Sequence, residues 1–86
     1  MINCEVTVKN PTGIHARPAT ELVKLATKFK SHITMSHDGK EADPKSIISL
    51  LSSALKAGTV ITLCVDGEDE ELAAKSICDF INNLED

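Results

Sequence analysis

A histidine and an arginine stand two positions apart in a segment that suits the start of a helix. The segment reads Gly13-Ile14-His15-Ala16-Arg17-Pro18-Ala19. Pro18 is compatible with a first helical turn because the amides there lack intrahelical acceptors, and this places His15 at the helix cap. First-turn amides, the positive end of the helix dipole and the Arg17 guanidinium would together stabilise a dianionic group on the imidazole. The segment therefore predicts a nucleophilic histidine that accepts a phosphate-sized group.

The same spacing leaves a plainer interpretation open. A single histidine before a helix is often a capping or loop residue, and Arg17 would then be a solvated charge. The spacing by itself does not decide between the two.

Composition limits the partners of this chain. The 86 residues carry a formal charge of −4, contain a single arginine, and include two phenylalanines but no tyrosine or tryptophan. A nucleic-acid surface needs a basic stripe and usually stacking rings, so we expect proteins or small anions as partners and no nucleic acid. No stretch approaches the roughly 18 apolar residues of a membrane span, and no basic region leads into an apolar run at Met1. We therefore expect no membrane insertion and a cytoplasmic location.

The three cysteines indicate neither a disulfide framework nor a metal site. They are odd in number, far apart in the sequence and without a C-x-x-C pair: Cys4, Cys64 and Cys78. We expect no metal and no cofactor.

Apolar residues recur with the periods of strands and helices along the whole chain. Alternation predicts strands at Ile2–Val8, Ile33–His37 and Ile61–Val65. The dipeptide Asp38-Gly39 predicts a hairpin turn after the second of these, and the short segment Lys40–Ala42 is then its returning strand. Helical spacing predicts a helix over about residues 16 to 29, a short one beginning after a capping Ser46, and a last one. The last helix should bury one side: Leu72, Ala73, Ile77, Phe80, Ile81 and Leu84.

This order of elements predicts an α+β fold. The order is βαββαβα, without a long crossover repeat, which favours an open-faced sandwich: a four-stranded antiparallel sheet with three helices on one face. We expect residues 1–86 to form a single domain.

The segment GIHARPA, residues 13–19, resembles the active-site signature of the histidine-containing phosphocarrier family HPr of the bacterial phosphoenolpyruvate-dependent sugar phosphotransferase system. A second match is Lys45-Ser46-Ile47, where the family carries its regulatory serine. The length and the order of elements agree from end to end. The resemblance implies a stoichiometric carrier, not an enzyme, that accepts a phosphoryl group from enzyme I on Nδ1 of His15 and donates it to IIA domains of sugar permeases.

The resemblance also implies roles for residues around His15. Arg17 would stabilise the phosphate. Partners would bind a surface formed by two helices: Ala16, Thr20 and Lys24 on the first, and Ile47, Ile48 and Leu51 on the second. Periodicity supports the second part independently, because the apolar residues of so short a helix cannot all face one core. Those that remain exposed would form a docking patch.

Many relatives are also phosphorylated on the serine matched by Ser46, which would add a serine kinase/phosphorylase and a transcriptional regulator to the partners. A dianion at this helix cap is locally favourable but would repel an acidic enzyme I, so it could inhibit transfer without unfolding the domain. The alternative is that Ser46 is only a cap. The sequence departs from the common family pattern at Ile48, Ser49 and Leu51, where Met, Gly and Met are frequent. Branched side chains repack less easily than methionine, which places recognition of several partners in doubt.

The sequence leaves three other classes of protein to consider, with different degrees of agreement. A nitrogen-related phosphocarrier shares the His15 signature and differs mainly in its partners. A regulatory paralogue of the Crh type acts through phosphoserine, and His15 argues against it because that branch lacks the active histidine. A small α/β binding domain without phosphoryl chemistry, such as a metal-handling module, is disfavoured because paired cysteines or a Cys/His cluster are absent.

The remaining polar residues receive structural assignments. His32 and His37 stand five residues apart, which places them on opposite faces of a strand, and we expect both to be solvated. Cys64 is expected to be a small structural thiol. The acidic run over residues 68–71 should place favourable charge at the start of the last helix.

Overall fold

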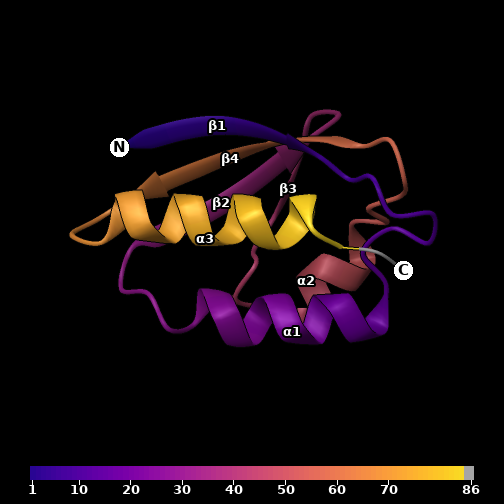
Figure 1. Cartoon of the computed structure of the whole chain (residues 1–86), viewed down its shortest axis with the longest axis horizontal. Helices are drawn as coiled ribbons and strands as arrows, with labels where there is room; N and C mark the ends of the chain where they lie inside the picture. Colours follow the sequence, from indigo (N-terminus) through magenta and orange to yellow (C-terminus); the bar gives the residue numbers. More distant parts are fainter. Residues whose placement is uncertain (85–86) are drawn as a thin grey trace.

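The computed structural model describes residues 1–84, and within them the predicted order βαββαβα is confirmed. Figure 1 shows the elements in chain order. Their bounds are β1 (Ile2–Thr7), α1 (Ala16–Ala26), β2 (His32–His37), β3 (Lys40–Ala42), α2 (Ile47–Ser52), β4 (Val60–Asp66) and α3 (Glu70–Asn82).

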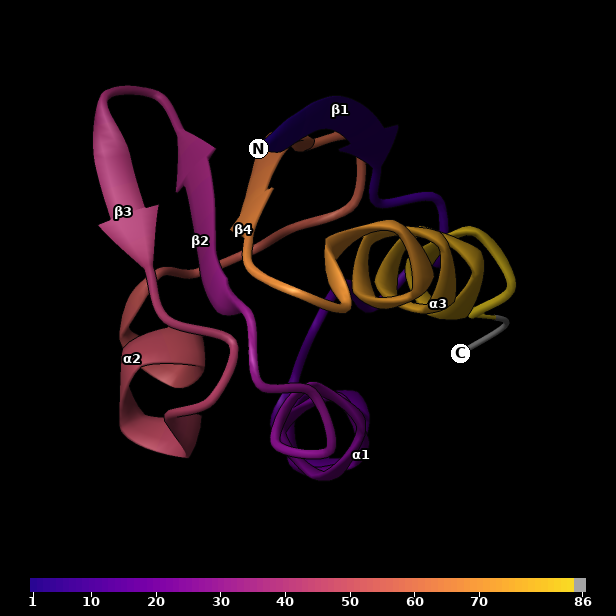
Figure 2. The same cartoon turned by 90° about the vertical axis from the view of Figure 1, so that its left-hand side faces the viewer.

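All neighbouring strands of the sheet are antiparallel, in the order β1-β4-β2-β3. The register pairs Cys4 with Leu63 across β1 and β4, and Met35 with Leu63 across β2 and β4. Figure 2 shows α1, α2 and α3 on the same side of this sheet. The predicted open-faced sandwich is therefore confirmed for the described residues.

Alternation along the strands builds the core, because every second side chain faces the helices. Val6, Ile33, Met35, Ile61, Leu63 and Val65 are buried on that face of the sheet. The helices supply the opposing layer: Ala19, Leu22, Ala26, Leu50, Ala73, Ala74, Ile77 and Ile81. This core fixes the first turns of α1 and α2 relative to the sheet.

The Asp38-Gly39 turn has the predicted hairpin chemistry. Both residues have positive φ, 49° at Asp38 and 77° at Gly39. A two-residue turn with this pair of angles matches the twist of the strands that it joins.

The first helix ends earlier than the sequence predicted. It stops at Ala26 instead of about residue 29, because the last turn tightens into bonds from Lys28 N to Leu25 O and from Phe29 N to Ala26 O. Phe29 is nevertheless half-buried, from the loop that follows. Its apolar spacing therefore indicated packing, not helix.

Two predictions about side-chain burial were wrong, one for His37 and one for Leu72. His32 is exposed but His37 is only 8% exposed, because it shares the helix-facing side of β2 with Ile33 and Met35. Leu72, expected in the core, is 61% exposed. The helix turns Ala73 and Ala74 inward instead, and these small residues let α3 approach the sheet closely.

Within residues 1–84 no helix has the length and the apolar content that crossing a lipid bilayer requires.

Candidate functional site

His15 occupies the N-cap of α1, as the sequence predicted. Its backbone is extended, with φ −96° and ψ −163°, and its carbonyl oxygen accepts the first helical hydrogen bond from Ala19 N at 2.8 Å. Its side chain is exposed and makes no capping hydrogen bond to the helix. N-cap side chains usually accept a hydrogen bond from an amide of the first helical turn, but the imidazole of His15 does not. Its ring faces solvent at the positive end of an 11-residue helix.

Backbone hydrogen bonds hold the loop before His15. Ile14 N donates to Leu55 O at 2.8 Å, which ties this loop to the one after α2. Gly13 has a φ of +69°, and a Cβ atom there would overlap the carbonyl oxygen of Leu55. Asn10 Nδ2 adds a bond to Gly13 O at 2.6 Å. His15 thus takes its position from main-chain contacts between two loops far apart in the sequence.

A shallow hollow of about 410 Å³ lies between these two loops. Its lining consists of residues that flank the histidine segment and residues after α2: Pro11, Thr12, Ile14, Ala54, Leu55, Lys56 and Ala57. His15 is not among them, so the histidine stands beside this hollow, on open surface where a protein partner can reach it.

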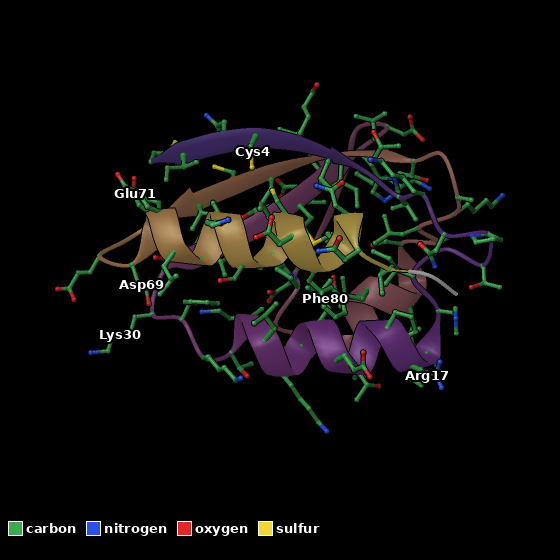
Figure 3. The ribbon with its side chains drawn as sticks, in the orientation of Figure 1. Cys4, Arg17, Lys30, Asp69, Glu71 and Phe80 are labelled. Carbon is green, nitrogen blue, oxygen red and sulfur yellow. The ribbon has the colours of Figure 1, made fainter. Side chains whose placement is uncertain are left out.

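Arg17 follows His15 in the first turn of α1, and Figure 3 shows it at the N-terminal end of that helix. Pro18 is buried beneath and, lacking an N–H, leaves no amide unsatisfied at its position. Ala16, Thr20 and Lys24 follow one another at intervals of four and are all exposed. The structure therefore brings these predicted residues together along one outer side of α1.

The second set of predicted docking residues lies on α2, which packs beside α1 (Figure 2). Leu50 is fully buried, Ile47 is half-buried, Ile48 is 75% exposed and Leu51 is 46% exposed. The expectation that part of this apolar set stays on the surface is confirmed. We call Ile48 and Leu51 the α2 patch.

Ser46 caps α2. Its Oγ accepts a hydrogen bond from Ser49 N at 3.3 Å, and its backbone oxygen accepts one from Leu50 N at 3.1 Å. Lys45 points elsewhere: its Nζ donates to Phe29 O and Ser31 O, which lie in the loop after α1. The capping role of Ser46 is confirmed, and its half-buried hydroxyl sits at the end of α2 that faces this loop.

Sequence reasoning missed three features of the structure. The first is the loop over residues 54–57. Its Leu55 carbonyl oxygen accepts a hydrogen bond from Ile14 N, and because this bond joins two main chains, no residue type in the sequence indicates it. The second is Asp69: its carboxylate accepts hydrogen bonds from Lys30 N at 2.9 Å, Ser31 N at 3.0 Å and Ser31 Oγ. The bond from Ser31 Oγ, then that from Lys30 N, holds the pKa of Asp69 below its usual value. The predicted acidic first turn of α3 is present as well, in Glu70 and Glu71.

The third missed feature is that Cys4 and Cys78, distant in the sequence, lie with their sulfur atoms 3.1 Å apart. Neither belongs to the His15 segment. Among the described residues, no three His, Cys, Asp or Glu side chains gather as they would to hold a metal ion.

The comparisons with known proteins decide the family. A family profile described as "PTS HPr component phosphorylation site" matches residues 2–83. The chain belongs to the HPr phosphocarrier family. The phosphocarrier protein HPr of Borreliella burgdorferi is 36% identical to it over 86 residues, covering all of both chains. A crystal structure of HPr from Thermoanaerobacter tengcongensis superposes with a TM-score of 0.91 at 40% identity, covering 95% of this chain and 92% of that one.

HPr-like proteins named Crh are similar to this chain to the same degree in sequence. The HPr-like protein Crh of Bacillus subtilis is 38% identical over 81 residues, covering 94% of this chain and 95% of its own. Overall similarity therefore shows an HPr phosphocarrier domain and does not separate this chain from the HPr-like proteins named Crh.

Proposed function

We propose that this chain, as a single domain, carries a phosphoryl group on His15, accepting it from phospho-enzyme I and donating it to IIA domains of sugar permeases. The observation that carries the proposal is the exposed His15 at the N-cap of α1, whose side chain is not used to cap that helix. The first turn offers positive dipole and amide donors to a phosphate on this ring. Membership of the HPr family supplies the chemistry that such a site would serve.

Each transfer forms one bond and breaks one. A ring nitrogen of His15, Nδ1 by resemblance to the family, attacks phosphorus as the bond from phosphorus to the donor breaks. The reverse exchange with a nucleophile of the acceptor regenerates the neutral imidazole. Phosphoryl transfer needs mainly positioning and charge stabilisation, and Arg17 would supply positive charge beside the three phosphate oxygens. The protein turns over no small molecule by itself, acts as a stoichiometric carrier and works in the cytoplasm.

The two helices beside His15 supply the docking surface of this proposal. Ile48 and Leu51 expose apolar area on α2, while the outer side of α1 presents Ala16, Thr20 and the cation Lys24. An exposed apolar patch with a polar border is typical of a transient protein interface. Half-buried Ile47 would support the patch from beneath.

Ser46 is the proposed regulatory site. A phosphate on its Oγ would replace the hydrogen bond from Ser49 N with a charge-assisted one and place a dianion next to the α2 patch. The domain would stay folded while an acidic enzyme I is repelled. A serine kinase/phosphorylase, and a transcriptional regulator that reads the phosphoserine, would be the further partners.

The first test is phosphorylation by phosphoenolpyruvate and enzyme I, read by intact mass and by acid lability. We expect one acid-labile phosphoryl group on the unaltered protein and none on His15→Ala. Arg17→Ala should react more slowly, and Lys28→Ala, which removes an exposed cation beyond the other end of α1, should react normally. No adduct with two unrelated enzymes I would overturn the carrier proposal.

The serine proposal has a separate test with a matched control. A serine kinase that acts on HPr proteins should add one acid-stable phosphate to the unaltered protein. Ser46→Ala should abolish this phosphorylation. Ser52→Ala, which changes an exposed serine of the same helix, should leave it intact. The phosphoserine form should then accept phosphate from enzyme I more slowly than the unmodified form. Equal rates would remove the regulatory role.

Two relatives within the family remain as alternatives, and each has a distinguishing observation. A nitrogen-related phosphocarrier would accept phosphate on His15 but pass it to a different set of acceptors. A Crh-like regulator would be phosphorylated on Ser46 and not on His15, and the close similarity to Crh keeps this outcome in the test.

A further inference from the structure

Cys4 and Cys78 form a thiol pair between the first strand and the last helix. Their sulfur atoms are 3.1 Å apart, close enough for one thiol to donate a hydrogen bond to the other, although 74 positions separate them in the chain. Cys4 lies on the helix-facing side of β1, opposite buried Leu63 of β4. Cys78 lies on α3 between the buried residues Ile77 and Ile81. Figure 3 shows Cys4 on β1 where that strand runs along α3.

The third cysteine is separated from this pair by the sheet. Cys64 is opposite Asn3 and Thr34 in the strand register, one residue out of phase with buried Leu63 and Val65. Its side chain therefore belongs to the open face, whereas the pair belongs to the helix-covered face. Cys64 has no neighbouring thiol on its own face, so it can be replaced without touching the pair.

We infer that Cys4 and Cys78 are an oxidative modification site that a peroxide closes to an intramolecular disulfide. A disulfide has a sulfur–sulfur bond of about 2.0 Å, so the two atoms need to approach by roughly 1 Å, which small rotations of two side chains can supply. Both side chains are partly exposed, so a molecule as small as hydrogen peroxide can reach them.

The chemistry balances in two steps. The Cys4 thiolate attacks hydrogen peroxide, breaks its O–O bond and becomes a sulfenic acid, with hydroxide as the leaving group. The Cys78 sulfur then attacks the Cys4 sulfur and displaces water, and the net reaction converts two thiols and one peroxide into one disulfide and two waters. Burial, then the hydrogen bond with Cys4, raises the pKa of Cys78 to about 12. Cys78 therefore stays protonated near neutral pH, and Cys4 is the sulfur that meets the oxidant first.

A disulfide between Cys4 and Cys78 would join the first strand to the last described helix. The bond would link β1 to α3 across 74 positions, which removes more chain entropy from the unfolded state than a short loop would. It would lie in the β1–α3 contact, whereas the His15 segment is held by the loop after α2. The proposal is independent of phosphoryl transfer and predicts that the oxidised protein still accepts phosphate on His15.

The test uses the full chain with Cys64→Ser, so that two thiols remain. After treatment with hydrogen peroxide, we expect the mass to fall by two hydrogens, both thiols to resist a maleimide label in denaturant, and dithiothreitol to restore labelling. The protein should stay monomeric on a non-reducing gel, and its Tm should rise by about 10 °C or more. Closure in the folded protein should be at least about tenfold faster than in urea, because the fold holds the sulfurs together.

Two further variants keep the proposal falsifiable. The protein with Cys4→Ser and Cys64→Ser should keep its Cys78 thiol reactive to maleimide. The one with Cys78→Ser and Cys64→Ser should be oxidised at Cys4 to a sulfenic acid that has no partner thiol. Neither should lose two hydrogens or show a rise in Tm. Persistence of both thiols in the parent, covalent dimers, higher oxidation of Cys4 without closure, or equal rates in buffer and in urea would each overturn the proposal.

Discussion

Ala54, in the loop directly after α2, has a backbone conformation that alanine rarely adopts. Ser53 is the C-cap of that helix, and Ala54 follows it with a φ of +51°. This is the left-handed conformation that glycine usually supplies after a helix, because a Cβ atom approaches the following carbonyl oxygen. The residue lies directly before Leu55, whose carbonyl oxygen holds the loop of His15. Replacing Ala54 with glycine should therefore stabilise the protein.

The magnitude follows from two opposing terms. Relief of the left-handed conformation contributes about 1–2 kcal/mol, whereas the greater freedom of glycine in the unfolded chain costs about 0.4–1 kcal/mol. The middle of each range leaves a net gain of about 0.8 kcal/mol for Ala54→Gly, which corresponds to a rise in Tm of roughly 3–6 °C for a domain of this size.

Urea denaturation followed by circular dichroism measures this gain. The midpoint should move upward with an unchanged slope, since little additional surface is exposed on unfolding. The matched control is Ala57→Gly, in the same exposed loop but without a positive φ. It should lose about 0.4–1 kcal/mol, because only the unfolded-state term acts there. Equal losses in both variants would refute the strain at Ala54.

Three further predictions concern glycine, acid and the α2 patch. Gly13→Ala should destabilise the protein by more than the roughly 1 kcal/mol expected for Gly39→Ala, because both have positive φ but only the former Cβ meets backbone. Equal melting temperatures of the two would contradict this. Since hydrogen bonds lower the pKa of Asp69, its carboxylate stabilises the fold above its unfolded pKa of about 3.9, and that stability is lost as pH falls through the lower folded value. The Tm difference between the unaltered protein and Asp69→Asn should therefore be constant above about pH 5 and begin to shrink below about pH 4; a difference that stays the same from about pH 5 down to about pH 2 would argue against it. Leu50→Ala should cost about 2–5 kcal/mol because it empties a buried site, whereas Ile48→Ala should change stability by less than about 0.5 kcal/mol yet slow phosphorylation by enzyme I. An unchanged rate for the second variant would remove the α2 patch from the docking surface.

The sequence predicted those features that local periodicity and turn chemistry control. Alternation located three of the strands, and the Asp38-Gly39 pair predicted the hairpin that adds β3, with a turn whose residues both have positive φ. The cap positions of His15 and Ser46 followed from residue types next to apolar runs. These signals are local, so they need no knowledge of what packs against what.

Most omissions come from contacts between distant segments, but the error at His37 does not. His37 shares the apolar side of β2 with Ile33 and Met35, so the alternation itself indicates its burial. The bond from Ile14 N to Leu55 O joins two main chains and leaves no preference for any side chain. The left-handed Ala54 has no sequence signal either, because alanine is a poor marker of positive φ. The backbone contacts that hold the loop of His15 therefore could not be predicted from the sequence.

The strand order has a consequence for how the chain folds as it is made. Among residues 1–84, β4 pairs with both β1 and β2, so only the β2–β3 hairpin can form before β4 is present. Pairing of β1 with β4 can begin only once Val60 has left the ribosome, because Thr7 pairs with Val60, and it is complete when Ile2 pairs with Val65. Until then β1 is unpaired and β2 has one unpaired edge, and such exposure is when nascent chains aggregate or require chaperones. Among the described strands β4 is therefore the last to be made, and it joins β1 to the β2–β3 hairpin.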